Sequence, residues 1–112
     1  MKATLSFSHM KESAPVRSVF LEKGRKVAKH LKRFKDDQVA LHGALDKNPH
    51  KEEFHASLTL YLPSATLHVR ECAEEYGTAF NEAFLDLARQ LRKYKDKRIR
   101  EKRRTARTLS RP

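Results

Sequence analysis

The stretch that decides the fold runs from residue 39 to residue 69 and reads VALHGALDKNPHKEEFHASLTLYLPSATLHV. Apolar and polar residues alternate here in three runs, which predict β-strands over about 39–46, 54–62 and 65–73. Turn-forming residues at 47–51 and 63–64 separate the runs, and such short breaks favour an antiparallel meander. Because each strand has one apolar face, the sheet needs cover on one side only.

A further strand and a helix precede this meander. Residues 3–8 alternate, with Leu5 and Phe7 facing one way, and predict a short strand. From about 14 to 34, apolar residues recur at helical spacing, with Ser13 as a plausible N-cap and Pro15 in the first turn. Gly24 lies near the apolar edge of this helix, where we expect it to allow a close approach to the sheet. A right-handed crossover through the helix would make the first two strands parallel.

A second helix is expected to begin near residue 73 or 74 and to close the domain. Its apolar stripe runs from Tyr76 to Tyr94, and both tyrosines are expected to pack in the core. The next position of the stripe is Arg98, so the helix should overhang the domain and fray by about residue 105. We therefore predict one domain over residues 1–104 and a basic, disordered tail over 105–112.

The resulting fold class is α+β: a two-layer β-α-β-β-β-α domain whose four-stranded sheet is covered on one face by two helices. The 112 residues suit one small domain. No run of 18 apolar residues exists, and the first ten residues hold no apolar stretch typical of a secretory signal. A single cysteine, Cys72, cannot form a disulfide within the chain, which favours the reducing cytoplasm.

Charge is the most informative feature of the composition. The formal net charge is +11, with a sequence pI near 10.1. Residues 17–35 carry eight basic residues and one acidic residue, and residues 89–112 carry twelve basic and two acidic residues, whereas the segment between them is acidic. Like charges in dense blocks repel each other, so this pattern indicates a polyanionic partner, either nucleic acid or an anionic membrane surface.

The basic side chains of the two predicted helices are the candidate phosphate contacts. Such contacts gain affinity by displacing counterions and do not read sequence, so folded RNA would be recognised by shape and backbone. The second helix is the better candidate because few acidic residues lie near its cations, while a solvated helix face is the competing interpretation. The candidate residues are Lys23, Arg25, Lys26, Lys29, Lys32, Arg33, Arg89, Arg92, Lys93, Lys95, Lys97, Arg98 and Arg100.

Three histidines and the cysteine are further candidates for chemistry. Side chains alternate between the two faces of a strand, and this alternation places three histidines on the polar face of three neighbouring strands: His42, His55 and His68. The same alternation places Cys72 on that face. Imidazoles on adjacent strands can converge on a metal, but only in a suitable strand register, which cannot be read from the sequence. We therefore expect these residues to be half-exposed sheet histidines, with no metal and no cofactor. Tyr61 on this face could stack on a base. The sequence holds no glycine-rich phosphate loop, GxSxG or HExxH motif, so we do not expect an enzyme.

Residues 87–97, LARQLRKYKDK, resemble the closing helix of the ribosome hibernation-promoting factors, also called ribosome-associated inhibitors or ribosome subunit interface proteins. Glu75 and Tyr76 resemble the start of that helix, and residues 67–69 fall where the family has its last strand. Glu22 and Lys23 resemble part of its first helix. The resemblance covers about residues 3–100 and corresponds to the short form, without the extra C-terminal dimerisation domain of long members.

This resemblance implies a translation inhibitor that docks on the small ribosomal subunit between head and body, where messenger and transfer RNA bind. The implied partners are the small subunit and its ribosomal RNA, with no membrane and no small-molecule substrate, and the protein would be a cytoplasmic monomer when off the ribosome. Composition alone indicates only a polyanion binder, so general double-stranded RNA or DNA binding is the alternative. A membrane-surface module is a third hypothesis, against which the basic tail argues because it lacks an apolar face.

Overall fold

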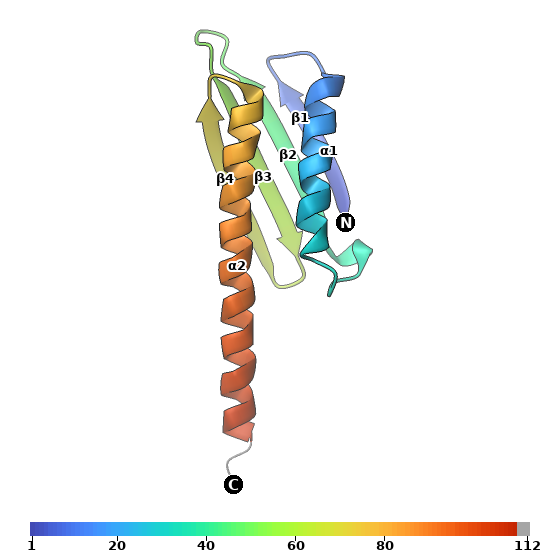
Figure 1. The fold of residues 1–112 in the computed structure, drawn as a ribbon, viewed down its shortest axis with the longest axis vertical. Coiled ribbons are helices and arrows are strands. Elements are labelled where there is room, and N and C mark those ends of the chain that lie inside the picture. The colour runs from blue at the N-terminus through green and yellow to red at the C-terminus, as the bar shows by residue number, and fades with distance from the viewer. Residues whose placement is uncertain (110–112) are drawn as a thin grey trace.

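The computed structural model describes the backbone of residues 1–109 and the side chains of residues 1–97 and Ile99. The observed element order matches the predicted β-α-β-β-β-α order, with one added 3-10 turn (Figure 1). The elements are β1 (Lys2–Ser8), α1 (Ala14–Lys29), η1 (Asp36–Gln38), β2 (Ala40–Lys47), β3 (Phe54–Leu62), β4 (Ala65–Ala73) and α2 (Tyr76–Leu109).

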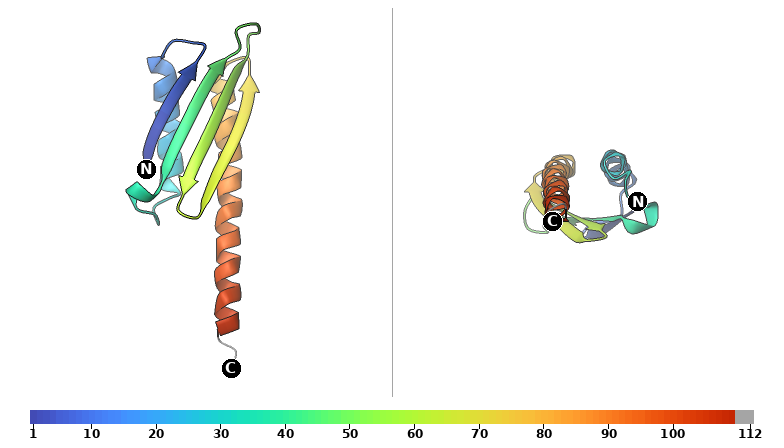
Figure 2. Two further views of the ribbon diagram at one scale, coloured as in Figure 1. Left: turned by 180° about the vertical axis from the view of Figure 1, so that it is seen from behind. Right: turned by 90° about the horizontal axis from the view of Figure 1, so that it is seen from below.

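The four strands form one sheet in the order β1-β2-β3-β4. As predicted, β1 is parallel to β2, and β2, β3 and β4 are successively antiparallel. Both helices cover the same face of this sheet and leave the other face bare (Figure 2). The two-layer fold class is therefore confirmed, and the helix side and the bare side are two chemically distinct surfaces.

The core lies between the sheet and the helices. Fully buried side chains from both layers meet there, among them Phe20 of α1, Phe80 and Leu87 of α2, and Leu58 of β3. The ring of Phe20 lies 6.0 Å, centroid to centroid, from the rings of both Phe80 and Phe84. Tyr76 and Tyr94 pack against this core, as expected.

A close approach between helix and sheet occurs at Gly43. A Cβ atom on Gly43 would lie 2.5 Å from Cε2 of Phe20, so the ring occupies the space that a side chain would need. Gly24 is also buried and faces Leu41 of β2, but a Cβ there would meet Leu41 Cδ2 at 3.6 Å, an ordinary contact, so the approach at this position does not require a glycine. Of these two positions, the closer approach is therefore at Phe20, whose ring packs directly over the backbone of Gly43.

Helix α1 begins as predicted and ends earlier. The Ser13 hydroxyl accepts a hydrogen bond from the Val16 N–H at 3.5 Å, which caps its first turn. The helix stops at Lys29 instead of 34, because His30, Leu31 and Phe34 donate to carbonyls three residues back, at 3.0 Å each. These tight turns keep Leu31 buried, so the apolar spacing continues past the helix end.

Helix α2 is shifted toward the C-terminus relative to its predicted bounds. It begins at Tyr76, where the Glu75 carbonyl accepts from the Ala79 N–H at 3.0 Å. It continues to Leu109 and extends beyond the sheet (Figure 1), since good helix formers occupy most of this segment and no glycine or proline occurs between Gly77, in its first turn, and Pro112. The division into residues 1–104 and 105–112 stays a prediction, and residues 110–112 lie outside the described part. Within the described part, no helix is long and apolar enough to cross a membrane.

Candidate nucleic-acid interface

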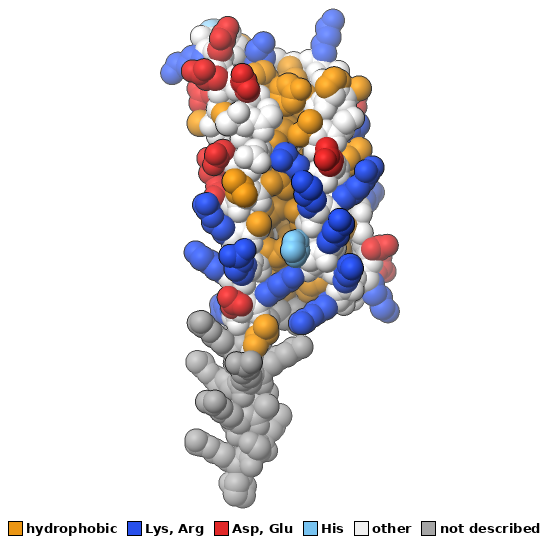
Figure 3. All heavy atoms as spheres, in the orientation of Figure 1, with side chains coloured by type: hydrophobic (Ala, Val, Ile, Leu, Met, Phe, Trp, Pro, Cys, Tyr) orange, Lys and Arg blue, Asp and Glu red, His pale blue; other side chains and the backbone are white. Residues whose placement is uncertain are grey.

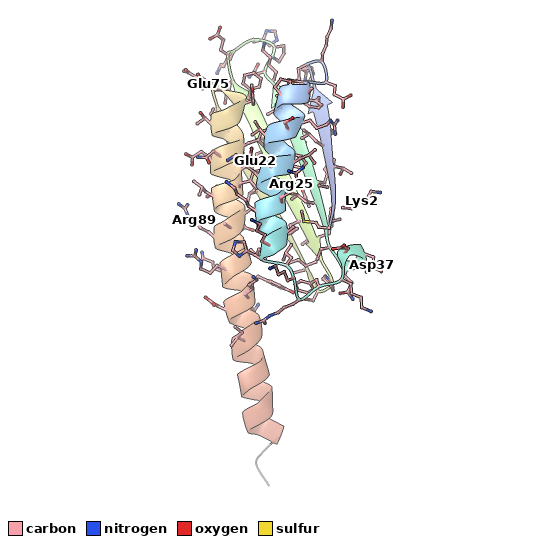
Figure 4. All side chains as sticks on the ribbon, turned by 45° about the vertical axis from the view of Figure 1, so that its right-hand side comes forward. Lys2, Glu22, Arg25, Asp37, Glu75 and Arg89 are labelled. Carbon is pink, nitrogen blue, oxygen red and sulfur yellow. The ribbon has the colours of Figure 1, made fainter. Side chains whose placement is uncertain are left out.

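The first basic block lies on α1 and on the turns that follow it. Arg25, Lys26 and Lys29 are exposed on the helix, and Lys32 and Arg33 are exposed beyond its end. In the described part of the chain, none of these five has a carboxylate within 4.0 Å. Their charge is therefore available to a partner. Figure 4 shows Arg25 on α1, together with Glu22 one turn earlier.

Lys23 belongs to the same block but is committed to the contact between the helices. Its side chain is half-buried, and its Nζ donates to Oδ1 of Asn81 in α2 at 3.2 Å. This hydrogen bond links residues 58 positions apart. Lys23 thus contributes positive charge to the surface while holding α1 against α2.

The second block lies on α2, and its members differ in their surroundings. Arg92, Lys93 and Lys97 are exposed, with no carboxylate within 4.0 Å among the described side chains. Arg89, whose side chain is 72% exposed, is an exception to the expected lack of acidic neighbours. Its Nη1 lies 3.2 Å from Oδ1 of Asp86, and it points away from α1 (Figure 4).

Lys95 departs furthest from its predicted role. It is half-buried, and its Nζ donates to the backbone carbonyl of His30, where α1 gives way to the following turns. A cation at this position donates to a carbonyl that the helix C-terminus leaves without a partner in the helix. Its charge also interacts favourably with the negative end of the helix dipole. Lys95 therefore fastens α2 to the end of α1. The side chains of Arg98 and Arg100 lie outside the described residues.

A groove runs between the two helices and separates the two blocks. Its volume is about 220 Å³, and its apolar walls include Val27, Phe84 and Leu91. Lys23 and Lys26 also line it. Figure 3 shows the apolar strip between the helices with Lys and Arg side chains along both sides. The sequence analysis missed this groove; the signal for it was Leu85, which lies outside the apolar stripe of α2 and is 48% exposed.

Acidic side chains gather on another part of the surface. Glu71 of β4 and Asp86 and Glu82 of α2 face one another at the outer edge of the domain. A hydrogen bond to Asp86, together with the charge of Asp86, holds the pKa of Glu71 above its ordinary value. In Figure 3 the acidic side chains lie mainly along this edge and at the top, and the basic ones beside the groove and below. The charges are separated in space as they are in sequence.

The three histidines do not converge on the bare face of the sheet. Thr59 stands in register with both His42 and His68, and so lies between them. Each imidazole Nδ1 is hydrogen-bonded to a threonine hydroxyl: His42 to Thr4 at 2.9 Å, and His68 to Thr59 at 2.8 Å. His55 lies in another row, in register with Cys72. Tyr61 is 49% exposed.

Residues 4–99 match the sequence model of the family described as sigma 54 modulation protein / S30EA ribosomal protein. A solved ribosomal subunit interface protein from Coxiella burnetii has a similar structure, with a TM-score of 0.68 and 19% identity over 86% of this chain and 99% of that one. The N-terminal domain of Protein Y from Thermus thermophilus gives a TM-score of 0.66 and 19% identity, covering 84% and 99% of the two chains. The search of curated proteins gave no match. At these identities the two structures show a shared fold.

Proposed function

The chain belongs to the sigma 54 modulation protein / S30EA ribosomal protein family, and on that premise we propose that it is a translation inhibitor that binds the small ribosomal subunit where messenger and transfer RNA bind. The docking surface is the solvent side of the helix layer. We define the basic band as the exposed cations there that have no carboxylate partner among the described residues. They are Arg25, Lys26, Lys29, Lys32, Arg33, Arg92, Lys93 and Lys97.

The basic band is the observation that carries the proposal. A surface cation paired with a carboxylate must first give up that pair, at a small cost, whereas an unpaired one binds RNA phosphates directly and gains by displacing their counterions. The band is built from two segments more than fifty residues apart in sequence, and the fold brings both to one layer. Ribosomal RNA is a dense polyanion of fixed shape, and phosphate contacts from helices suit it without reading sequence.

The length of α2 adds reach to this surface. The helix has 34 residues, which at 1.5 Å per residue gives about 50 Å. It packs on the sheet over its first half and then continues past it (Figure 1). A helix rich in Lys and Arg that projects from a small domain can enter a channel lined by RNA, while the domain remains at the channel wall. Inhibition then arises by occupancy: while the protein is bound, messenger and transfer RNA cannot take the same place.

The test is inhibition of in-vitro translation by the purified protein, with and without messenger and transfer RNA already on the small subunit. We expect synthesis to fall without RNA cleavage or nucleotide consumption, and the inhibition to weaken when the subunit is already occupied. Co-sedimentation with small subunits, vacant ribosomes, duplex RNA and anionic liposomes, offered side by side, should favour the ribosomal particles. Equal retention on duplex RNA would support the general nucleic-acid binder instead, and inhibition that ignores prior occupancy would place the protein elsewhere.

A further inference from the structure

We propose that Glu53, His55 and Cys72 form a binding site for Zn²⁺ on the bare face of the sheet. The site lies at the end of the sheet where β3 begins and β4 ends. It is opposite the helix layer, and it does not depend on the proposed ribosome binding.

The topology brings the three side chains together. His55 and Cys72 are register partners on the adjacent antiparallel strands β3 and β4, so their side chains leave the sheet on the same face. Glu53 precedes β3 by one residue. One ligand atom from each of the three residues lies within 4.8 Å of the other two.

The observed spacing is close to what a tetrahedral ion requires. Zinc binds imidazole nitrogen and carboxylate oxygen at about 2.0–2.2 Å and thiolate sulfur at about 2.3 Å, so ligand atoms in a tetrahedral site are roughly 3.3–3.8 Å apart. Nε2 of His55 already lies 3.4 Å from Oε1 of Glu53. Since the three ligand atoms lie within 4.8 Å of one another, the sulfur needs to move by at most about 1.5 Å, which a side-chain rotation on an exposed strand residue supplies.

The donor set also fits zinc. Thiolate, imidazole and carboxylate are the three protein ligand types that Zn²⁺ uses, and three protein ligands with water in the fourth position form a complete coordination shell. In the metal-free protein the Cys72 sulfur and a Glu53 carboxylate oxygen are neighbours, within 4.8 Å of each other. On binding, zinc takes the place of the thiol proton, which leaves to solvent, and the ion then joins both groups.

The backbone ahead of β3 is held by hydrogen bonds, and two of the three side chains have limited exposure, whereas that of Cys72 is exposed. The Glu53 N–H donates to the Lys51 carbonyl at 2.8 Å, and the Glu53 carbonyl accepts from the Asn48 N–H at 2.9 Å, so the chain ahead of β3 is held in place. The side chains of His55 and Glu53 are only 23% and 29% exposed. Asp46, the partner of His55 on β2, is engaged with His9 at 2.7 Å, which leaves the fourth position to water.

Zinc and cobalt binding to the purified 112-residue protein, kept reduced with a phosphine, tests this assignment. We expect one Zn²⁺ per chain by titration calorimetry and a thiolate-to-metal absorption band with Co²⁺. Cys72→Ser should abolish the band, and His55→Ala and Glu53→Gln should each weaken zinc binding by about tenfold or more. The matched control is His68→Ala, which removes a histidine from the same face of β4 and should leave binding unchanged.

Thermal unfolding supplies a second readout, because an ion bound only by the folded state raises Tm. Zinc should raise the Tm of the wild type and of His68→Ala, and should not raise that of Cys72→Ser. The proposal is wrong if the wild type takes up no stoichiometric zinc, if Cys72→Ser binds it equally well, or if one ion bridges two chains. Glu53→Gln lies outside the strands, so it remains informative should a strand variant fail to fold.

Discussion

At the scale of single residues, the contact between Phe20 and Gly43 sets how closely helix and sheet approach. Phe20 is fully buried and touches Phe80 and Phe84 of the other helix, so its ring cannot withdraw without disturbing α2. Below the ring, Gly43 supplies space by having no side chain. The pair therefore acts as one packing unit that spans α1, α2 and β2, and it makes the core sensitive to a single added methyl group.

Gly43→Ala should therefore destabilise the protein. The new Cβ would sit 2.5 Å from Phe20 Cε2, and the required shift of a fully buried ring costs about 1–3 kcal/mol. The matched control is Gly24→Ala, where the nearest atom lies at 3.6 Å and a helix-interior glycine is replaced by the best helix former, with a gain of up to about 1 kcal/mol. Urea unfolding of both variants measures the difference. Equal stability of Gly43→Ala and wild type would show that the ring is not confined.

At the scale of elements, much of the fold could be predicted from the sequence because alternation and helical spacing are local signals. All four strands follow from alternation, and the meander follows from its short turns. The end of α1 could not be predicted, since tight turns keep Leu31 in the core and imitate a longer helix.

Contacts between residues far apart in the sequence could not be predicted, for a different reason. The hydrogen bond from Lys95 to His30 joins residues 65 positions apart, and charge alone gave it the same role as its neighbours. Likewise, parity placed Cys72 and His55 on one face, but only the register shows that they stand side by side. Such pairs depend on how elements meet, which local patterns do not encode.

The contact between β4 and α2 carries a pH dependence of its own. The pKa of Glu71 is raised above 4.5, because Asp86 hydrogen-bonds to it and repels its charged form, with further repulsion from Glu82. A raised carboxyl pKa means that the folded state holds the proton more tightly than the unfolded state. The stabilisation that comes from protonated Glu71 is therefore fully present below the pKa of this group in the unfolded state. It is lost as the pH rises through the higher pKa of the folded state.

Glu71→Gln should accordingly raise Tm modestly at neutral pH, because it removes the charge that Asp86 repels. The gain should vanish as pH falls well below 4.5, where the carboxyls of both states are protonated. Glu52→Gln, an exposed glutamate outside this cluster, is the control and should give a flat difference. Differential scanning calorimetry of both variants and the wild type across pH measures the change in Tm. A gain that persists unchanged in acid would mean that the side chain acts through packing rather than charge.

At the scale of the whole molecule, folding gathers the cations and sets them apart from the acids. The acidic middle of the sequence supplies β2, β3, β4 and the start of α2, and the basic blocks flank it on both sides along the chain. In space, the two blocks come to the same layer with the groove between them (Figure 3). Net charge alone would attract any polyanion, whereas this placement presents the cations on one face only, and under the proposed function that face would meet RNA while the bare sheet stays free.

If the whole band binds at once, removing charge from its two halves should weaken small-subunit binding additively, because the halves lie on different elements and share no partner among the described residues. Each lost phosphate contact should shallow the log–log salt slope by about 0.7–0.9. Glutamine keeps helix propensity close to that of lysine and arginine, so the fold should survive, and Lys95 is left intact because it holds the end of α1. The two triple variants are Arg25, Lys29 and Arg33 to Gln, and Arg92, Lys93 and Lys97 to Gln, measured singly and combined.

The control removes equal charge from exposed cations of the strands and of the loop before β3, namely Lys2, Lys51 and Arg70. It should leave affinity and slope nearly unchanged, since those side chains lie outside the basic band. Binding across a salt series distinguishes a specific surface from a diffuse attraction. If the control costs as much as either triple variant, affinity follows net charge alone; if one triple variant accounts for the entire loss, the other half of the band does not touch the ribosome. If the losses of affinity add and the control variant binds as the wild type does, both halves of the basic band contact RNA in one orientation, with the groove facing the same partner.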